Sequence, residues 1–233
     1  MSAVQLADGV WRLPTAPYDL INSFLLADDD GLTLVDAGLQ GADRRLLAAL
    51  AGLGRSPDEV TRVLLTHAHP DHAGGLAATV RATGAPVHAH DRDATYLRDG
   101  RSPRRDPSTT WGRLLDRLPG GGFAPTPVAG TFEDGALLPV AGGLRVVHTP
   151  GHSPGHCSFL LEDRGVLITG DAIVNVRGLR WSPKAFCTDV RLSRESAARL
   201  GELDFTTAAF THGAEVTRGA RQAVRAFVAG RPS

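Results

Sequence analysis

The chain has almost no lysine, little cysteine and no net charge. Of its 25 basic residues 24 are arginine, which leaves Lys184 as the only lysine among 233 residues. Schiff-base enzymes and P-loop nucleotide-binding proteins both need a lysine, and no glycine-rich loop precedes Lys184. The sequence therefore excludes both of these classes.

Cysteines and long apolar runs are scarce as well. The two cysteines, Cys157 and Cys187, are too few for a metal–thiolate cluster or a disulfide framework. The first 20 residues lack the features of a signal peptide, and no apolar run is long enough to span a bilayer. We therefore expect a cytoplasmic protein without a membrane partner. Because 25 acidic residues balance the 25 basic ones, we expect a small-molecule substrate and no nucleic-acid partner.

Strand-like and helix-like patterns alternate along the chain. Apolar stretches at 4–14 and 19–36 predict an opening layer of β-hairpins, and leucines at helical spacing predict a helix over 42–53. Further strands are predicted at 60–66, 86–89, 144–148, 157–161, 166–169 and 207–211, and further helices at 74–83, 193–203 and 216–229. This interleaving predicts an α/β fold, with sheets covered by helices, in a single domain over residues 1–233.

One stretch, at about 100–130, differs from its surroundings because it is rich in proline, glycine and arginine. Within it Trp111, Leu114, Leu115 and Leu118 lie at helical spacing, which predicts a short helix. We interpret this stretch as a surface insertion that forms a lid.

The strongest chemical signal is T-H-A-H-P-D-H at residues 66–72, directly after a predicted strand. Alternate side chains of an extended segment point the same way, so His67 and His69 should lie side by side, while the Pro70 turn directs Asp71 and His72 elsewhere. Imidazole and carboxylate ligands suit zinc, iron or manganese, and a catalytic site keeps one coordination position open for water. This loop therefore predicts metal binding and can serve two ions.

Two ions need more ligands than one loop supplies. His152 lies in the tight turn T-P-G-H-S-P-G, Asp171 ends a strand in I-T-G-D, and His212 follows a strand in T-H-G. A layered sheet gathers such loops along one edge. Taken alone, each of these residues is more typical of an ordinary turn, so their predicted role depends on the histidine loop.

The motifs of this chain and their order resemble those of the metallo-β-lactamase fold hydrolases. They are H-A-H-P-D-H, T-P-G-H-S-P-G-H, I-T-G-D and T-H-G, and L-V-D-A-G at 34–38 fits the same family. The resemblance extends from Asn22 to His212. It implies a four-layer αββα sandwich. Its motifs are specific for the fold and the metal site and weak for the substrate.

The resemblance also implies a ligand set for two divalent metal ions, with zinc expected and iron or manganese as alternatives. The first ion would be held by His67, His69 and His152, the second by Asp71, His72 and His212, and Asp171 would bridge them. Thr211 departs from the family pattern, because many relatives have glycine before the last histidine. We expect this change to shift the loop slightly without removing the ligand.

Two further features each have two interpretations. Asp36 either caps a turn at the end of a strand or accepts a hydrogen bond that orients a metal-binding imidazole. The arginines at 98, 101, 104 and 105 form either a solvated loop or a contact for an anionic substrate.

The resemblance favours a hydrolase of the glyoxalase II and lactonase-like branch, which would cleave an ester, thioester or lactone with a hydroxide that bridges two metals. Asp71 would orient the hydroxide and carry a proton as the catalytic acid and base. Only 21 residues follow His212, too few for the helical glutathione-binding domain of glyoxalase II. A β-lactamase is less expected because such enzymes are normally exported.

Three alternatives to this hydrolase stay open. A persulfide dioxygenase has a similar motif set and uses a single Fe(II). An RNA-processing nuclease shares the fold but is disfavoured by the zero net charge. A catalytically silent metal-binding protein is the non-enzymatic alternative, and the full ligand set argues against it. The sequence makes no prediction about the oligomeric state.

Overall fold

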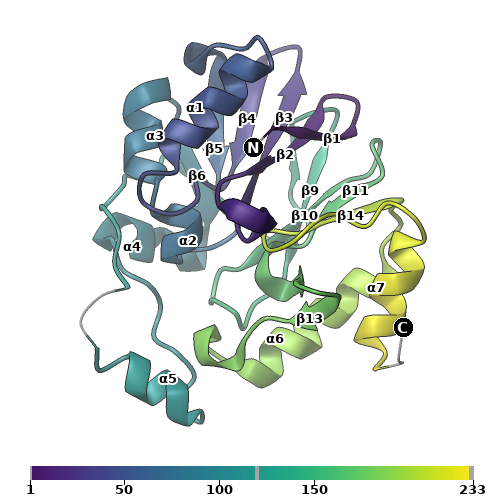
Figure 1. Ribbon diagram of the computed structural model, residues 1–233. Helices are drawn as coiled ribbons and strands as arrows, with labels where there is room; N and C mark the ends of the chain where they lie inside the picture. The colour runs from purple at the N-terminus through teal and green to yellow at the C-terminus, as the bar shows by residue number, and fades with distance from the viewer. Residues whose placement is uncertain (1, 119–120, 231–233) are drawn as a thin grey trace.

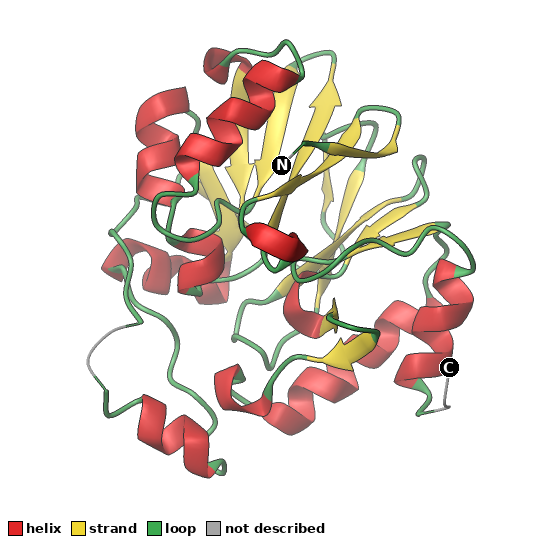
Figure 2. Ribbon diagram, in the orientation of Figure 1, coloured by secondary structure: helices red, strands yellow, loops and turns green. Residues whose placement is uncertain are grey.

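Two β-sheets lie face to face, with helices on both outer sides (Figures 1 and 2). The computed structural model describes residues 2–118 and 121–230. The first sheet has seven strands in the order β1-β2-β3-β4-β5-β6-β7, antiparallel up to β4 and parallel from β4 to β7. Its strands are β1 Val4–Ala7, β2 Val10–Pro14, β3 Asn22–Asp28, β4 Gly31–Val35, β5 Val60–Leu64, β6 Val87–His90 and β7 Gly130–Phe132.

The second sheet has the order β14-β11-β10-β9-β8, and only the β14–β11 pair in it is parallel. Its strands are β8 Leu137–Leu138, β9 Leu144–His148, β10 Cys157–Leu161, β11 Val166–Ile168 and β14 Thr207–Ala209. A separate hairpin pairs β12 Ile173–Asn175 with β13 Leu179–Trp181.

The helices cover the two outer faces. They are α1 Asp43–Gly52, α2 Pro70–Ala73, α3 Leu76–Thr83, α4 Asp91–Asp99, α5 Thr110–Leu115, α6 Val190–Ala197 and α7 Ala220–Val228. Short 3-10 turns are η1 Pro17–Asp19, η2 Pro57–Glu59, η3 Gly170–Ala172, η4 Lys184–Phe186 and η5 Ala198–Glu202. Helices α1 and α3 lie outside the first sheet, and α6 and α7 lie outside the second (Figure 1).

Three buried apolar layers hold these four structural layers together. Leu46 and Leu50 of α1 pack with Leu34 of the first sheet. Between the sheets, Phe24 from the first lies in one cluster with Phe159 from the second. A third cluster joins the second sheet to η5 and α7. Burying the apolar face of each element on both sides of each sheet produces the predicted αββα sandwich, and this prediction is confirmed.

Most predicted elements are present, with differences at their ends. The last helix begins at Ala220 and not at 216, because the backbone of Val216 exchanges hydrogen bonds with Ala208 beside the second sheet. Helix α6 begins three residues before the predicted start, because the Asp189 carboxylate caps it by accepting a bond from the Leu192 N–H. The hairpin β12–β13 and helix α4 were not predicted.

The insertion at 100–130 does contain a helix, α5, which packs against η4. In the described part of the chain, no helix has both the length and the apolar character needed to cross a membrane.

Candidate metal centre

The seven predicted ligands meet at one edge of the two sheets. The first sheet contributes the loop and helix α2 that follow β5, with His67, His69, Asp71 and His72. The second sheet contributes the other three, namely His152 from the β9–β10 loop, Asp171 from η3 after β11 and His212 after β14. Because β11 and β14 run parallel, their carboxyl ends place Asp171 and His212 next to each other.

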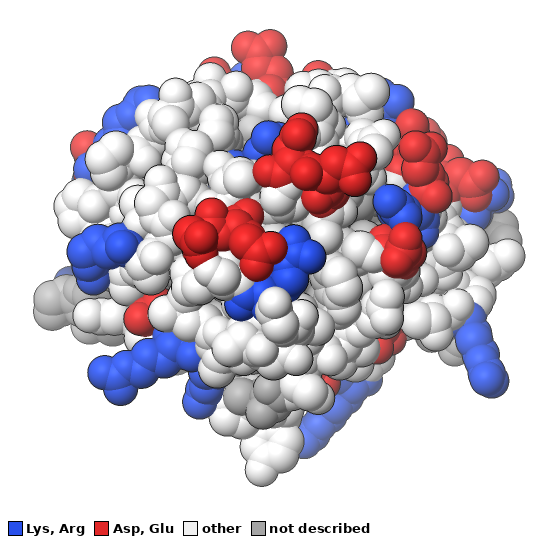
Figure 3. All heavy atoms as spheres, turned by 90° about the horizontal axis from the view of Figure 1, so that it is seen from above, with Lys and Arg blue, Asp and Glu red and all other residues white. Residues whose placement is uncertain are grey.

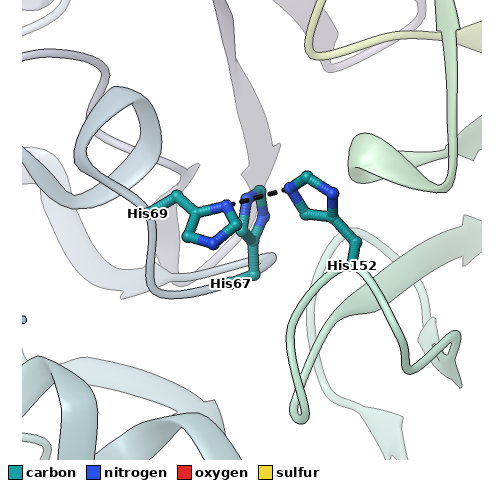
Figure 4. A group of neighbouring side chains, drawn as sticks. All are labelled: His67, His69 and His152. Atoms are coloured by element: carbon teal, nitrogen blue, oxygen red, sulfur yellow. Dashed lines mark hydrogen bonds between the residues drawn. The ribbon is translucent and has the colours of Figure 1, made fainter. Parts of the chain in front are cut away.

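His67, His69 and His152 form the first of two groups. Each offers one ring nitrogen, and these three nitrogens lie within 4.8 Å of one another. The rings point toward a common centre, and His69 Nδ1 lies 2.9 Å from His152 Nε2 (Figure 4). All three side chains are buried. This is the grouping predicted for the first ion.

Asp71, His72, Asp171 and His212 form the second group, with the same mutual limit of 4.8 Å. The Asp171 carboxylate lies 3.4 Å from His72 Nε2 and 3.2 Å from His212 Nε2. It also lies 3.4 Å from His152 Nε2 of the first group. Asp171 therefore sits between the groups, where a bridging ligand is required. Thr211, the departure from the family pattern, donates a hydrogen bond of 2.6 Å to Asp171.

Two buried nitrogens indicate that the site suits cations. His67 Nε2 and His72 Nε2 are buried and have no hydrogen-bond partner among the described residues. A buried polar atom without a partner is costly, and a metal ion would satisfy both nitrogens. Nitrogen and carboxylate donors in sets of three and four fit zinc, iron or manganese. The residues therefore fit two divalent ions, while the binding itself and the identity of the ions remain predictions.

The surroundings of the first group favour the neutral form of its three imidazoles, which is the form that binds a metal ion. Burial lowers the pKa of His67 and His152 well below its usual value, and neighbouring imidazoles add to this effect. Burial also lowers the pKa of His69, to about 4. Each ring is therefore neutral at pH 7, as a metal ligand must be.

The second group is electrostatically different. Burial lowers the pKa of His72, but the carboxylates of Asp71, Asp171 and Asp36 outweigh it and raise the value to about 9. Burial also lowers the pKa of His212, but the carboxylates of Asp171 and Asp71 outweigh this effect and raise the pKa to about 11. The protonated imidazoles balance the negative charge of the carboxylates. Metal cations in the site would balance this charge instead and displace the protons.

Asp36 accepts hydrogen bonds at both carboxylate oxygens. Its Oδ2 accepts from His72 Nδ1 at 2.8 Å and from the Thr66 hydroxyl at 2.7 Å, and its Oδ1 accepts from the Thr66 N–H at 2.8 Å. The bond to Nδ1 leaves His72 Nε2 free to face the second group. Of the two interpretations, the geometry favours orientation of an imidazole, which remains a prediction until metal binding is measured.

Asp93 is a buried carboxylate that the sequence analysis missed. Its Oδ2 accepts from the Ala68 N–H at 2.9 Å and from the Ser153 hydroxyl at 2.6 Å, and its Oδ1 accepts from the Gly155 N–H at 2.6 Å. Asp93 thus joins the histidine loop to the His152 turn. In the sequence it lies between Arg92 and Ala94 in a stretch with many charged residues, so no pattern distinguished it.

Two more side chains, Ser182 and His156, form hydrogen bonds with predicted ligand residues but belong to neither ligand group. The Ser182 hydroxyl lies 3.0 Å from His152 Nδ1, which directs Nε2 inward. His156 accepts from the Asp171 N–H at 2.7 Å and donates through Nδ1 to the Thr149 carbonyl. Ser182 was missed because nothing in the sequence marks a single loop serine as a hydrogen-bond partner of His152.

A cavity of about 530 Å³ opens over the two groups. Its floor includes His69, Asp71, His152, Asp171 and His212, and its apolar walls are Ile21, Leu39, Val174, Val176, Pro183 and Phe186. Pro70, together with Ser102 and Arg105 of the insertion, completes the lining, so of the four arginines considered above only Arg105 reaches this cavity.

The structure is an αββα sandwich with two groups of candidate metal ligands at one edge, which is the arrangement of a metal-dependent protein. The family model described as the metallo-beta-lactamase superfamily matches residues 17–226. The chain belongs to this superfamily.

The relatives of this chain include proteins named as a probable metallo-hydrolase and as a thioesterase. "Probable metallo-hydrolase YybB" of Bacillus subtilis (strain 168) is 27% identical over 84% of this chain and 82% of its own length. "Atrochrysone carboxyl ACP thioesterase" of Aspergillus fumigatus is 29% identical over 73% of this chain, but the match spans only 35% of that relative. The crystal structure of a metallo-beta-lactamase family protein from Thermus thermophilus has a TM-score of 0.73 and 30% identity, over 97% of this chain and 80% of that one.

Proposed function

We propose that the chain is a metal-dependent hydrolase with two divalent ions that cleaves an acyl bond, with a thioester as the preferred substrate over an ester or lactone. The observation that carries this proposal is the pair of ligand groups around Asp171 at the floor of an apolar cavity. Two ions at such a site would lower the pKa of a shared water toward about 7 and so supply a hydroxide at neutral pH.

The protein's own residues would orient the substrate and move the proton. Asp71 has a one-third exposed side chain that lines the cavity, and its carboxylate lies 3.4 Å from His212 Nε2. It is therefore placed to accept a proton at the cavity floor and return it to the departing group. The apolar walls would bury an acyl chain and exclude water from the reacting bond.

The relatives named as a metallo-hydrolase and a thioesterase support acyl hydrolysis over the alternatives. The persulfide dioxygenases have a similar motif set, so the metal content separates the two functions: two ions with hydrolysis, against a single Fe(II) with oxygen consumption. An RNA-processing nuclease would need a continuous basic track. The formal net charge of the chain is zero, and on the face seen from above acidic side chains lie near the centre, with basic ones mostly toward the rim (Figure 3).

The first prediction tests the ligand set by substitution. His67→Ala and Asp171→Ala should each reduce the metal content per chain and lower kcat/KM at least about 1,000-fold, because His67 is one of three donors in the first group and Asp171 lies between the two groups. Elemental analysis and turnover on a panel of thioesters, esters and lactones with one common acyl chain would measure both effects.

His88→Ala is the matched control, since His88 lies on β6 and belongs to neither group. It should keep two ions and wild-type turnover. Unchanged turnover in His67→Ala, or a wild-type protein with one iron and oxygen consumption, would contradict the proposed hydrolase.

A further inference from the structure

A second hollow, of about 780 Å³, adjoins the metal cavity and is surrounded by arginine. Its lining includes Arg101, Arg104, Arg105, Arg113 and Arg117, and among the described lining residues Asp116 is the only acidic one. We call these five side chains the arginine cluster. They account for 5 of the 24 arginines of a chain with zero formal charge, and all of them lie within residues 101–117.

The cluster is poorly neutralised from within the protein. Arg105 Nη1 lies 2.8 Å from the Asp116 carboxylate, and Arg101 Nε lies 3.0 Å from that of Asp99. In the part of the chain that the structure describes, Arg104, Arg113 and Arg117 have no ion pair. Gathering like charges around one hollow is unfavourable, so this arrangement is best stabilised by an anion.

The hollow and the metal cavity share a wall. Ser102 and Arg105 line both of them. A single molecule can therefore place an uncharged acyl group against the apolar walls of the cavity and a charged group beside the arginines. Several guanidinium groups suit a phosphate, whose oxygens accept paired hydrogen bonds, better than a carboxylate, which one arginine satisfies.

We propose that the arginine cluster binds the phosphate of a 4′-phosphopantetheine thioester, while the acyl group of that thioester lies in the metal cavity. This inference rests on the proposed thioester hydrolysis. In that reaction water adds to the acyl carbon, the carbon–sulfur bond breaks, and the thiol leaves with a proton. The phosphate stays remote from the reacting bond and serves binding alone.

The test compares one acyl chain on two leaving groups. One substrate is acyl-coenzyme A, which carries phosphates, and the other is the same acyl group on pantetheine, which carries none. In the wild-type protein KM should be at least about tenfold lower for acyl-coenzyme A. Arg104→Gln with Arg117→Gln should remove this difference by raising KM for acyl-coenzyme A alone, with kcat unchanged, because the lost phosphate contact is made equally in the bound substrate and in the transition state.

Arg44→Gln with Arg81→Gln is the matched control, because it removes two arginines from α1 and α3, on another part of the surface. It should leave both KM values unchanged. Equal KM values for the two substrates in the wild-type protein, or equal effects of both double variants, would overturn the proposal.

Direct binding separates this inference from the hydrolase proposal. Coenzyme A itself, titrated in a calorimeter, should bind to the wild-type protein and about tenfold more weakly to the Arg104→Gln/Arg117→Gln variant, with an affinity that falls as salt rises. This result would support the phosphate site even if no thioester were cleaved. An acyl-carrier-protein substrate in the same KM series would show whether the phosphate comes from a carrier or from coenzyme A. Displacement of coenzyme A by single-stranded RNA, with cleavage of that RNA, would overturn the proposal.

Discussion

At the scale of single residues, Asp93 is the side chain on which both ligand loops depend. It is fully buried and accepts three hydrogen bonds, two from backbone N–H groups and one from a hydroxyl. An asparagine in its place has one acceptor oxygen, and its NH2 group would face a donor. Asp93→Asn should therefore lower the free energy of unfolding by about 2–4 kcal/mol, since buried donors lose their partner.

The same variant should weaken metal affinity about 10- to 100-fold, because supporting groups hold ligands in position. Chemical denaturation and metal titration would measure the two effects. Asp91→Asn, two residues away with a 54% exposed side chain, should change the free energy of unfolding by less than about 0.5 kcal/mol. If Asp93→Asn matched Asp91→Asn in both measurements, Asp93 would not hold the loops together.

The close spacing of the histidines explains why these ligands were predicted from the sequence. The residues that form hydrogen bonds with the ligand loops have no such spacing and were not predicted. His67, His69 and His72 are recognisable because three imidazoles in six residues are rarely needed by a turn. Ser182 and Asp93 are ordinary polar residues in the sequence, and only tertiary contacts place them beside the ligand loops. Such contacts join residues far apart in the chain, and local periodicity carries no information about them.

At the scale of elements, the insertion is attached to the body by Asp106. The Asp106 carboxylate accepts from the N–H groups of Val190, at the start of α6, and of Ser108, and its own N–H donates to the Cys187 carbonyl. These bonds position the segment that carries Ser102 and Arg105 over the cavity.

Asp106→Ala should raise KM several-fold for every thioester while leaving the metal content at its wild-type value, because it loosens the cavity wall and touches no predicted ligand. Substrate kinetics, elemental analysis and the rate of limited proteolysis within the insertion would check this. Asp58→Ala in η2, away from the cavity, is the control. A reduced metal content or an unchanged KM in Asp106→Ala would show that the insertion does not act as a substrate-binding wall.

Elements with a strong apolar period were predicted, and elements that depend on tertiary packing were not. Helix α1 has buried leucines at helical spacing, which its sequence shows directly. Helix α4 buries Ala94 and Leu97 but also Asp93, so its apolar face is short and interrupted. Val216 fits an apolar helical pattern, yet its pairing with Ala208 decides its conformation.

At the scale of the whole molecule, the candidate metal centre lies where the two halves of the sandwich meet. Four predicted ligands belong to loops of the first sheet and three to loops of the second. The sheets are joined elsewhere by apolar side chains such as Phe24 and Phe159. Ions at this edge would therefore cross-link the halves in addition to their chemical role.

Removing the ions should lower the melting temperature without unfolding the chain, because the apolar layers between the sheets stay intact. A ligand present at about 1,000 times its dissociation constant stabilises the folded state by about 4 kcal/mol. For a domain of this size, that corresponds to roughly 8–16 °C, at about 2–4 °C per kcal/mol. Calorimetry before and after treatment with a chelator, and again after zinc is restored, would measure the shift. The His67→Ala variant should respond less to the chelator, since its first group is already incomplete. Equal melting temperatures with and without chelator would mean that no bound ion links the two sheets.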